Sequence, residues 1–337
     1  MGRWRMVTRP TVLSISGGKD SAALALHLRE LGVEPAARIW MDTGWEHPDT
    51  YRYIDEVLEP SLGAITRLRV DVPVLPGFEG AVAELEAMLG GRPSPMVRLC
   101  IWKGFFPGQG TRWCTQALKT VPAARFLASL DEDVLNAVGV RAEESASRAK
   151  MPEREPMPRV EVPPVVRSDG EGRWIDLDHV EQWRPLLRWT VQDVVEIHRR
   201  HALPMNPLYR DGSSRVGCWP CIFASKDDLR QLARDDERVE VLRRLESIVG
   251  DRAKVRRTER SAAGEKQRVP MPPPTWFQVR DPVAGAGSMH ACQPIDRVLE
   301  WASTARGGRQ IEAFAPPSSD WACSRWGYCE TRPKEGS

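Results

Sequence analysis

The sequence predicts an α/β fold, with a parallel sheet flanked by helices and a mostly helical or irregular C-terminal extension. Three observations lead to this prediction. Short apolar runs alternate with helix-like segments through the first two thirds of the chain. A glycine pair joins the first apolar run to a helical segment. Polar motifs follow the later runs, where a parallel sheet presents ligand-facing residues.

Composition sets wide limits on function. The 337 residues can form one large domain with additions or two domains, and a hydrophobic fraction of 41% supports a core. A formal net charge of +2 neither requires nor excludes a polyanionic partner. Arginine is concentrated over residues 199–268, which indicates either a polyanion-facing surface or a solvated helical face.

The chain shows no apolar run as long as a membrane span and no signal-peptide pattern at its start. We therefore expect a cytoplasmic protein without a membrane partner. In a reducing compartment, its seven cysteines are expected to serve metal or redox chemistry rather than disulfides.

The first expected strand covers residues 11–15, and the first expected helix covers residues 22–31. The turn between them offers glycine flexibility, helix N–H groups, the positive end of the helix dipole, a lysine and two hydroxyls. These features predict a phosphate-binding turn. Its residues are Ser16, Gly17, Gly18, Lys19, Asp20 and Ser21, of which Lys19 and Asp20 are also candidate catalytic residues.

These six residues do not match the P-loop spacing. They resemble the SGGxDS loop of the PP-loop ATP-pyrophosphatase superfamily, which includes the phosphoadenosine phosphosulfate (PAPS) reductases. The resemblance implies a Rossmann-like, adenine nucleotide alpha hydrolase-like fold and a turn that holds the pyrophosphate of ATP or an adenylyl sulfate. The intact Gly-Gly-Lys favours ATP, with Mg²⁺ expected on its pyrophosphate.

A second strand is expected at residues 36–41 and a third at 65–70, with a helix at 51–58. The second strand is followed by Asp42, Thr43 and Gly44. This sequence resembles the superfamily's DTG turn, so we assign the three residues to the nucleotide site, with Asp42 near the ribose or a metal and Glu46 a weaker candidate. Residues 73–95, around a short helix at 79–89, are expected to form an insertion or a mobile cover.

A fourth strand is expected at residues 134–140 and is followed by Arg141, Glu144, Ser145 and Arg148. The two arginines suit phosphate or sulfate oxygens, and the competing interpretation is a surface ion-pair cluster. The segment resembles a G-[IV]-R-x-x-E-S-x-x-R motif of the superfamily, which assigns these four residues to nucleotide binding.

Residues 150–172 are expected to be irregular, and residues 183–189 to form a short strand. A helix is expected from a Thr190 N-cap through His198, with Asp193 as the capping-box partner. The succession that ends in Asn206-Pro207-Leu208-Tyr209 extends the resemblance to about the first two thirds of the chain.

Cys218 and Cys221 form a C-x-x-C on a tight turn, a spacing that suits zinc, an iron–sulfur cluster or a dithiol. Cys114 lies in a stretch that resembles the first cysteines of the iron–sulfur reductases, with Trp113 at the first position of their Cys-Cys pair. The resemblance implies a [4Fe-4S] cluster held by Cys114, Cys218, Cys221 and a fourth cysteine. We choose Cys329 as the fourth, with Cys323, Cys292 and Cys100 as alternatives and zinc as the alternative metal.

Further along the chain, residues 227–248 have the pattern of one long amphipathic helix, residues 252–274 that of a linker, and residues 294–302 that of a last helix. We therefore expect a nucleotide-binding α/β domain at 1–215, followed by the C-x-x-C turn, a helical segment and a cysteine-containing tail at 216–337.

These features favour an ATP-using enzyme that adenylates an acceptor for sulfur transfer, with a nucleic acid as one candidate acceptor and a sulfur-donor protein or thiol reductant as a partner. One alternative is a reductase of phosphoadenylyl or adenylyl sulfate with Cys329 as the nucleophile, which would preclude Cys329 as a permanent ligand. Another is a non-catalytic subunit that binds a nucleotide or nucleic acid.

Overall fold

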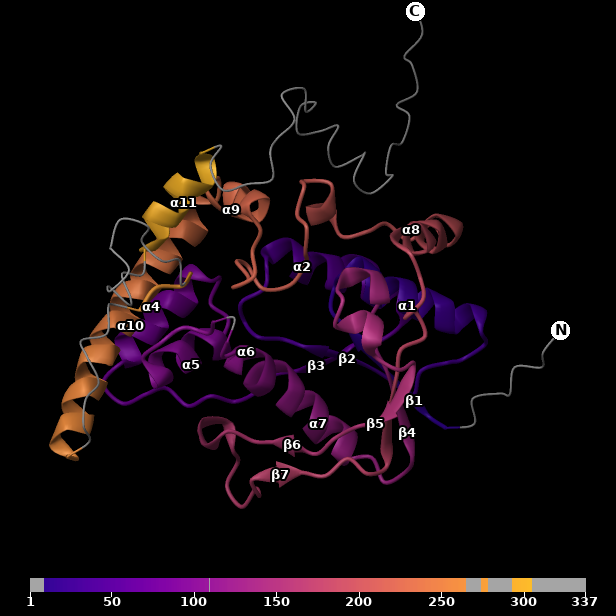
Figure 1. The fold of residues 1–337 in the computed structure, drawn as a ribbon, viewed down its shortest axis with the longest axis horizontal. Coiled ribbons are helices and arrows are strands. Elements are labelled where there is room, and N and C mark those ends of the chain that lie inside the picture. The colour runs from indigo at the N-terminus through magenta and orange to yellow at the C-terminus, as the bar shows by residue number, and fades with distance from the viewer. Residues whose placement is uncertain (1–8, 109, 265–273, 278–292, 305–337) are drawn as a thin grey trace, which may run out of the picture.

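The computed structural model describes residues 9–108, 110–264, 274–277 and 293–304. Its centre is a six-stranded sheet in the order β3-β2-β1-β4-β8-β5, parallel except for the edge strand β5 (Figure 1). The strands are β1 (Thr11–Ile15), β2 (Ala37–Met41), β3 (Thr66–Leu68), β4 (Val134–Ala137), β5 (Arg154–Pro156) and β8 (Val180–Trp183). A separate pair, β6 (Val160–Glu161) and β7 (Trp174–Ile175), is antiparallel. The predicted fold class is confirmed.

Both faces of the sheet are covered because its central strands are apolar on both faces. Leu13 and Ile15 of β1 pack with α1 (Lys19–Glu30) and α8 (Val191–Arg200) in one core, whereas Val12 belongs to the core on the opposite face. Figure 1 shows α1 and α8 together on one side, opposite α7 (Val121–Ala128).

The first part of the chain contains further α-helices. They are α2 (Pro48–Tyr53), α3 (Glu59–Leu62), α4 (Glu79–Met88), α5 (Pro95–Lys103) and α6 (Trp113–Thr115). Two π-helical turns join them, Ile54–Leu58 between α2 and α3 and Gln116–Thr120 between α6 and α7. The helix expected within residues 73–95 is present as α4, and its Val82 and Leu85 pack into the main core.

The C-terminal helices pack against the α/β part of the molecule. They are α9 (Lys226–Leu232), α10 (Asp236–Ala262) and α11 (Ile295–Ser303). The long helix α10 runs alongside α4 and α5, at the left of Figure 1, and contacts α11. Leu242, Leu245 and Trp276 share one core with Val12 and Ile39 of the sheet, so residues from both sides of position 215 pack together.

Two expectations for strands were wrong. The strand predicted at 183–189 instead ends at Trp183, and residues 184–189 form turns closed by the bonds Leu187 N to Arg184 O and Trp189 N to Leu186 O. Pro185, which has no N–H to donate, favours this exit from the sheet. The segment expected to be irregular, 150–172, contains β5, which pairs with β8, and β6.

Two expectations for helices were also wrong. The single helix predicted at 227–248 is divided between α9 and α10, because the Asp235 carboxylate accepts the N–H of Arg238 and starts a new helix there. The linker expected from residue 252 is helical through Ala262. Arg252 is buried and Arg256 donates to the Lys103 carbonyl of α5, so packing sustains the basic stretch as helix. Among the described residues, no helix has the length and apolar character to cross a membrane.

Candidate nucleotide and thiol site

The turn between β1 and α1 contains two glycines, Gly17 and Gly18. Any larger side chain at either position would require the neighbouring residues to move. Gly17 has a φ of +73°, and a Cβ there would lie 2.8 Å from the Thr50 methyl group of α2. A Cβ on Gly18 would lie 3.2 Å from the Tyr209 hydroxyl. The backbone therefore runs close to two neighbouring segments at the point where a phosphate would approach.

The two serines of this turn bond to each other and to the backbone. The Ser21 hydroxyl donates to the Gly18 carbonyl at 3.0 Å and accepts the Ser16 N–H at 3.1 Å. The two hydroxyl oxygens lie 3.1 Å apart. The N-cap residue Gly18 has no side chain to cap α1, so the N–H groups of the first turn have no partner within the helix, and only that of Lys19 is accepted by a described side chain, the Tyr209 hydroxyl. Such a helix start favours an anion.

A network of charges lies directly beside the turn. Lys19 Nζ donates to Asp20 at 2.7 Å, and Arg141 Nε donates to the other oxygen of that carboxylate at 2.6 Å. Arg141 also donates to Glu143 at 2.5 Å. Burial raises the pKa of Asp20, but the nearby Lys19 and Arg141 outweigh this effect and hold it below its usual value. Asp20 thus binds both Lys19 and Arg141 beside the turn.

The segment after β4 holds the other predicted anion-binding residues. A Cβ on Gly139 would lie 2.8 Å from the Asp20 carbonyl oxygen, so this glycine lets the segment approach α1. Glu144 accepts the Arg141 N–H at 3.1 Å and forms an ion pair with Arg148, and the Ser145 hydroxyl accepts the Arg148 N–H at 3.2 Å. The structure therefore brings Arg141 to the Ser16–Ser21 turn and pairs Arg148 with Glu144.

Three residues that the sequence analysis did not assign to the site bond to the backbone of the Ser16–Ser21 turn. His198 Nε2 of α8 lies 3.0 Å from the Lys19 carbonyl, Asn206 Nδ2 donates to the Gly17 carbonyl at 3.2 Å, and the Tyr209 hydroxyl accepts the Lys19 N–H at 3.3 Å. The sequence did contain a signal for Asn206 and Tyr209, because the Asn-Pro-Leu-Tyr run formed part of the resemblance to the superfamily.

The predicted Asp42-Thr43-Gly44 turn ends β2 and is buried. The Asp42 carboxylate accepts the Gly44 N–H at 2.9 Å and the Tyr51 hydroxyl at 2.8 Å, and it pairs with Arg69. Gly44 has a φ of +67°, and a Cβ there would lie 2.6 Å from the Ser94 Cα. Asp42 therefore makes its contacts within the protein, where it shapes the turn.

Glu46 closes the same turn. Its buried carboxylate accepts the Thr43 hydroxyl at 2.7 Å, the Trp45 N–H at 3.1 Å and the Tyr51 hydroxyl at 3.2 Å. Burial raises the pKa of Glu46 above its usual value, against the opposing charge of Lys119. Glu46 is thus hydrogen-bonded to Thr43, Trp45 and Tyr51, and we call these four residues the floor of the site.

The C-x-x-C loop docks onto this floor. Trp219 N donates to the Trp45 carbonyl at 2.8 Å, and Trp45 Nε1 donates to the Pro220 carbonyl at 3.2 Å. Cys218 forms a β-bridge with Glu46, and its sulfur lies 4.0 Å from the Thr43 hydroxyl. Residues 175 positions apart in the sequence therefore place Cys218 against the predicted nucleotide turn.

Cys114, Cys218 and Cys221 lie close together, since Cys221 contributes to the raised pKa values of both Cys114 and Cys218. Burial raises the pKa of Cys218 to about 12 and also raises that of Cys114. Lys119 stands among them, and the neighbouring Cys218 raises its pKa. Cys100 is fully buried near Cys114. Among the described residues, no three His, Cys, Asp or Glu side chains are arranged to hold a metal ion.

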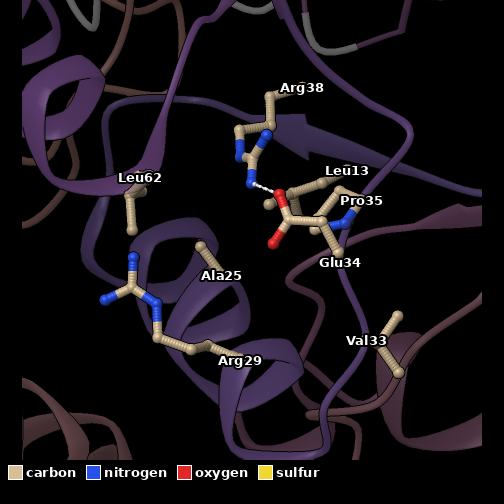
Figure 2. Close-up of a pocket in the computed structure, with 8 residues that line it drawn as sticks. All are labelled: Leu13, Ala25, Arg29, Val33, Glu34, Pro35, Arg38 and Leu62. Atoms are coloured by element: carbon tan, nitrogen blue, oxygen red, sulfur yellow. Dashed lines mark hydrogen bonds and ion pairs between the residues drawn. The ribbon is translucent and has the colours of Figure 1, made fainter.

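Three cysteines assigned in the sequence analysis, Cys292, Cys323 and Cys329, lie outside the described residues. A hollow at the far end of α1 is unrelated to the site. Figure 2 shows it lined by Arg29, Arg38 and Glu34 among others, and it has room for about one water molecule.

The family of the chain follows from comparison with known proteins. The model of the phosphoadenosine phosphosulfate reductase domain matches residues 10–73 and 100–224, more than half of the chain. The chain belongs to this PAPS reductase family. The match includes the Ser16–Ser21 turn, the Asp42–Gly44 turn, Arg141 and all three clustered cysteines. An adenine nucleotide-binding enzyme is the class that this membership supports.

Several relatives are similar over much of the chain. An uncharacterised 37.8 kDa protein of Escherichia phage 186 is 31% identical over 95% of this chain and 96% of its own length. Adenosine 5'-phosphosulfate reductase of Deinococcus radiodurans is 25% identical over 66% of this chain and 71% of its own. A crystal structure of PAPS reductase from Candida auris aligns with 65% of this chain and 86% of its own, at 18% identity and a TM-score of 0.41.

Proposed function

We propose that the protein uses ATP to adenylate an acceptor oxygen, which a sulfur nucleophile then replaces. One observation carries this proposal. The C-x-x-C loop is hydrogen-bonded to the Asp42–Glu46 turn, and α2, which follows that turn, packs against Gly17 of the Ser16–Ser21 turn. The Ser16–Ser21 turn and the C-x-x-C loop are therefore connected through the Asp42–Glu46 turn and α2, which supports a shared site.

In the first step, the acceptor oxygen attacks the α-phosphorus of ATP, and the bond to the pyrophosphate oxygen breaks. The N–H groups at the start of α1 and the ammonium of Lys19 would neutralise the leaving pyrophosphate. In the second step, a sulfide or persulfide sulfur attacks the carbon that bears the adenylated oxygen, the C–O bond breaks and AMP leaves with the oxygen. A persulfide leaves the acceptor joined to its donor by a disulfide, which a thiol reductant then cleaves. The protein's contribution is mainly positioning and charge neutralisation.

The site suits a magnesium ion only if that ion arrives with the nucleotide. The two aspartates predicted for the site are already engaged, Asp20 by Lys19 and Arg141, and Asp42 by Arg69 and Tyr51. Magnesium usually binds through substrate phosphates and a small number of protein groups, so it would be held on the pyrophosphate.

Three thiolates suit iron–sulfur ligation in their donor chemistry, but the described cysteines are not arranged as a metal-binding group in this structure. The proposal of a cluster therefore rests on residue type and on a fourth ligand outside the described residues. Cys114, Cys218 and Cys221 would supply three ligands, and Cys329 would supply the fourth. Bound there, a [4Fe-4S] cluster would supply a redox centre next to the nucleotide. Zinc is the alternative. Iron, sulfide and zinc analysis of anaerobically purified protein distinguishes them: about four irons support the cluster, whereas stoichiometric zinc contradicts it.

The reaction is tested by exchange of labelled pyrophosphate into ATP. We expect exchange by the wild-type protein with its acceptor present and none by Lys19→Ala, because the substitution removes the charge beside the leaving group. A folded Lys19→Ala variant that exchanges at the wild-type rate would remove the mechanism. ATP binding without any exchange in the wild type would favour a non-catalytic subunit.

A second candidate function is reduction of phosphoadenylyl or adenylyl sulfate by a thiol. The observation that favours it is the similarity to proteins named as adenosine 5'-phosphosulfate and PAPS reductases. In this reaction a Cys329 thiolate would attack sulfur, AMP or its 3'-phosphorylated form would leave, and a second thiol would release sulfite and form a disulfide. Sulfite release from adenylyl sulfate or phosphoadenylyl sulfate with a dithiol would establish this function, and no release from either substrate would exclude it.

A further inference from the structure

Two arginines and an aromatic ring form a small platform beside the thiols. The Arg112 guanidinium carbon lies 5.7 Å from the centroid of the Phe223 ring, and that of Arg215 lies 5.8 Å from the same centroid. Both arginines are exposed, and the ring is partly exposed. Such distances are those of cation–π contacts. We call Arg112, Phe223 and Arg215 the Arg-Phe-Arg platform.

The charges of the platform are not neutralised within the described part of the chain. Neither Arg112 nor Arg215 has an ion pair or side-chain hydrogen bond to a described residue, whereas Arg243, for example, bonds to both Asp296 and Glu240. Two solvent-facing cations without carboxylates make this surface attractive to a polyanion.

All three platform residues are close in sequence to the thiols. Arg112 is two positions before Cys114 and immediately precedes α6, whereas Arg215 is three positions before Cys218. Phe223 is two positions after Cys221, in a turn closed by the bond from Ala224 N to the Cys221 carbonyl at 2.9 Å. A molecule bound on the platform would therefore lie next to the sulfur chemistry.

We propose that the Arg-Phe-Arg platform binds single-stranded nucleic acid and so presents the acceptor to the thiols. This inference rests on the proposed function, because it names the class of acceptor for the same site. A base can stack on the Phe223 ring, and the flanking phosphates can pair with the two arginines. Single-strand binding surfaces combine these two elements, an aromatic ring and cations along the backbone.

The test measures binding of fluorescently labelled single-stranded DNA and RNA of one sequence to the full chain by anisotropy. We expect the Arg112→Ala/Arg215→Ala variant to bind at least about tenfold more weakly at low salt. The slope of log affinity against log salt should fall by about 1.4, the value for two lost phosphate contacts on a single strand. Phe223→Ala should weaken binding about 5- to 150-fold without changing that slope.

Arg243→Ala is the matched control, since it removes an exposed arginine of α10 that already has carboxylate partners. It should bind nucleic acid as the wild type does. The inference would be overturned if the wild type bound neither single-stranded DNA nor single-stranded RNA. It would also be overturned if Arg243→Ala lost as much affinity as the double variant. A parallel loss of ATP or adenylyl sulfate affinity in the double variant would also overturn it, by assigning the platform to the nucleotide.

Failure of the proposed function is distinguishable from failure of this inference. Lys19→Ala should abolish pyrophosphate exchange and leave strand binding unchanged, because Lys19 and the platform lie on different elements. Strand binding that survives without any exchange in the wild type would reject the adenylation step alone.

Discussion

Asp20 is the residue on which the charges of the phosphate turn depend. The sequence predicted it as a phosphate-site and catalytic residue because it lies in the SGGKDS run. In the structure its carboxylate joins Lys19 and Arg141, residues 122 positions apart, in one buried ion-pair network. Asp20 therefore holds the two cations together beside the Ser16–Ser21 turn.

Replacing Asp20 by Asn should lower the free energy of unfolding by about 2 kcal/mol at neutral pH, because two charge-assisted hydrogen bonds lose their ionised acceptor. The pKa of Asp20 lies below its ordinary value of 3.8. Its stabilising contribution is therefore present above pH 3.8 and is lost as the pH falls through the folded-state pKa. Urea unfolding of both proteins at neutral and acidic pH measures this difference.

The control for Asp20→Asn is Glu144→Gln, which alters the ion pair with the half-exposed Arg148. Exposed pairs contribute about 0–1 kcal/mol, so its effect should be the smaller one. A difference between wild type and Asp20→Asn that stayed constant below pH 3.8 would contradict this account.

At the scale of single residues, the place of the Ser16–Ser21 turn between a strand and a helix was predictable, because a short local motif encodes it. The roles of His198, Asn206 and Tyr209 were not, since each acts through a backbone group almost 200 positions away. The burial of Asp42 against Tyr51 and Arg69 likewise depends on packing that a single sequence does not reveal.

Among the elements, the loop that carries the C-x-x-C is held at both ends by one side chain. The buried Asp228 carboxylate of α9 accepts the N–H and hydroxyl of Ser214 and the N–H and hydroxyl of Ser225. Cys218, Cys221 and Phe223 all lie between those two serines. The Asp228 carboxylate therefore both caps α9 and closes the loop that carries the thiols.

Asp228→Ala should lower the free energy of unfolding by about 2–3 kcal/mol and should also loosen the loop, because four donors lose their common acceptor. Limited proteolysis within residues 214–225, followed by mass spectrometry, measures the second effect. Asp227→Ala is the matched control, since its carboxylate is exposed and contacts only Arg230 of the same helix among the described residues. Equal cleavage rates in the two variants would contradict the role given to Asp228.

The expected elements were most accurate where periodicity was strong, as in β1, α1 and α8. The capping box of Thr190 and Asp193 is present as expected. The boundary between α9 and α10 was missed, because the apolar spacing continues through it while Asp235 caps the second helix and accepts Trp219 Nε1 at 2.8 Å. A tertiary bond thus overrode the local pattern.

On the scale of the whole molecule, the C-terminal residues complete the core beneath the thiol site. The ring of Trp276 lies 4.8 Å from that of Trp45 and 5.5 Å from that of Phe106, and all three side chains are buried. Trp45 belongs to the floor on which the C-x-x-C loop docks. Sequence periodicity could not reveal this contact, because it joins two segments 231 positions apart.

Trp276→Ala should lower the free energy of unfolding by about 3–5 kcal/mol, because it leaves a large cavity in a shared core. Tryptophan fluorescence and far-ultraviolet circular dichroism should report coincident urea transitions at the lower midpoint. Trp301→Ala, which truncates a partly exposed ring on α11, should cost less than about 1 kcal/mol. A Trp276→Ala variant as stable as the wild type would show that these segments do not depend on each other.

The central claim is that the Ser16–Ser21 turn holds the phosphates of an adenine nucleotide, and calorimetric titration with ATP tests it most directly. The wild type should bind ATP, and Lys19→Ala should bind it at least about tenfold more weakly, the loss expected for one charge-assisted contact. Lys254→Ala, which removes an exposed lysine of α10, should bind ATP as the wild type does. Equal affinities of the wild type and a folded Lys19→Ala variant would contradict the account.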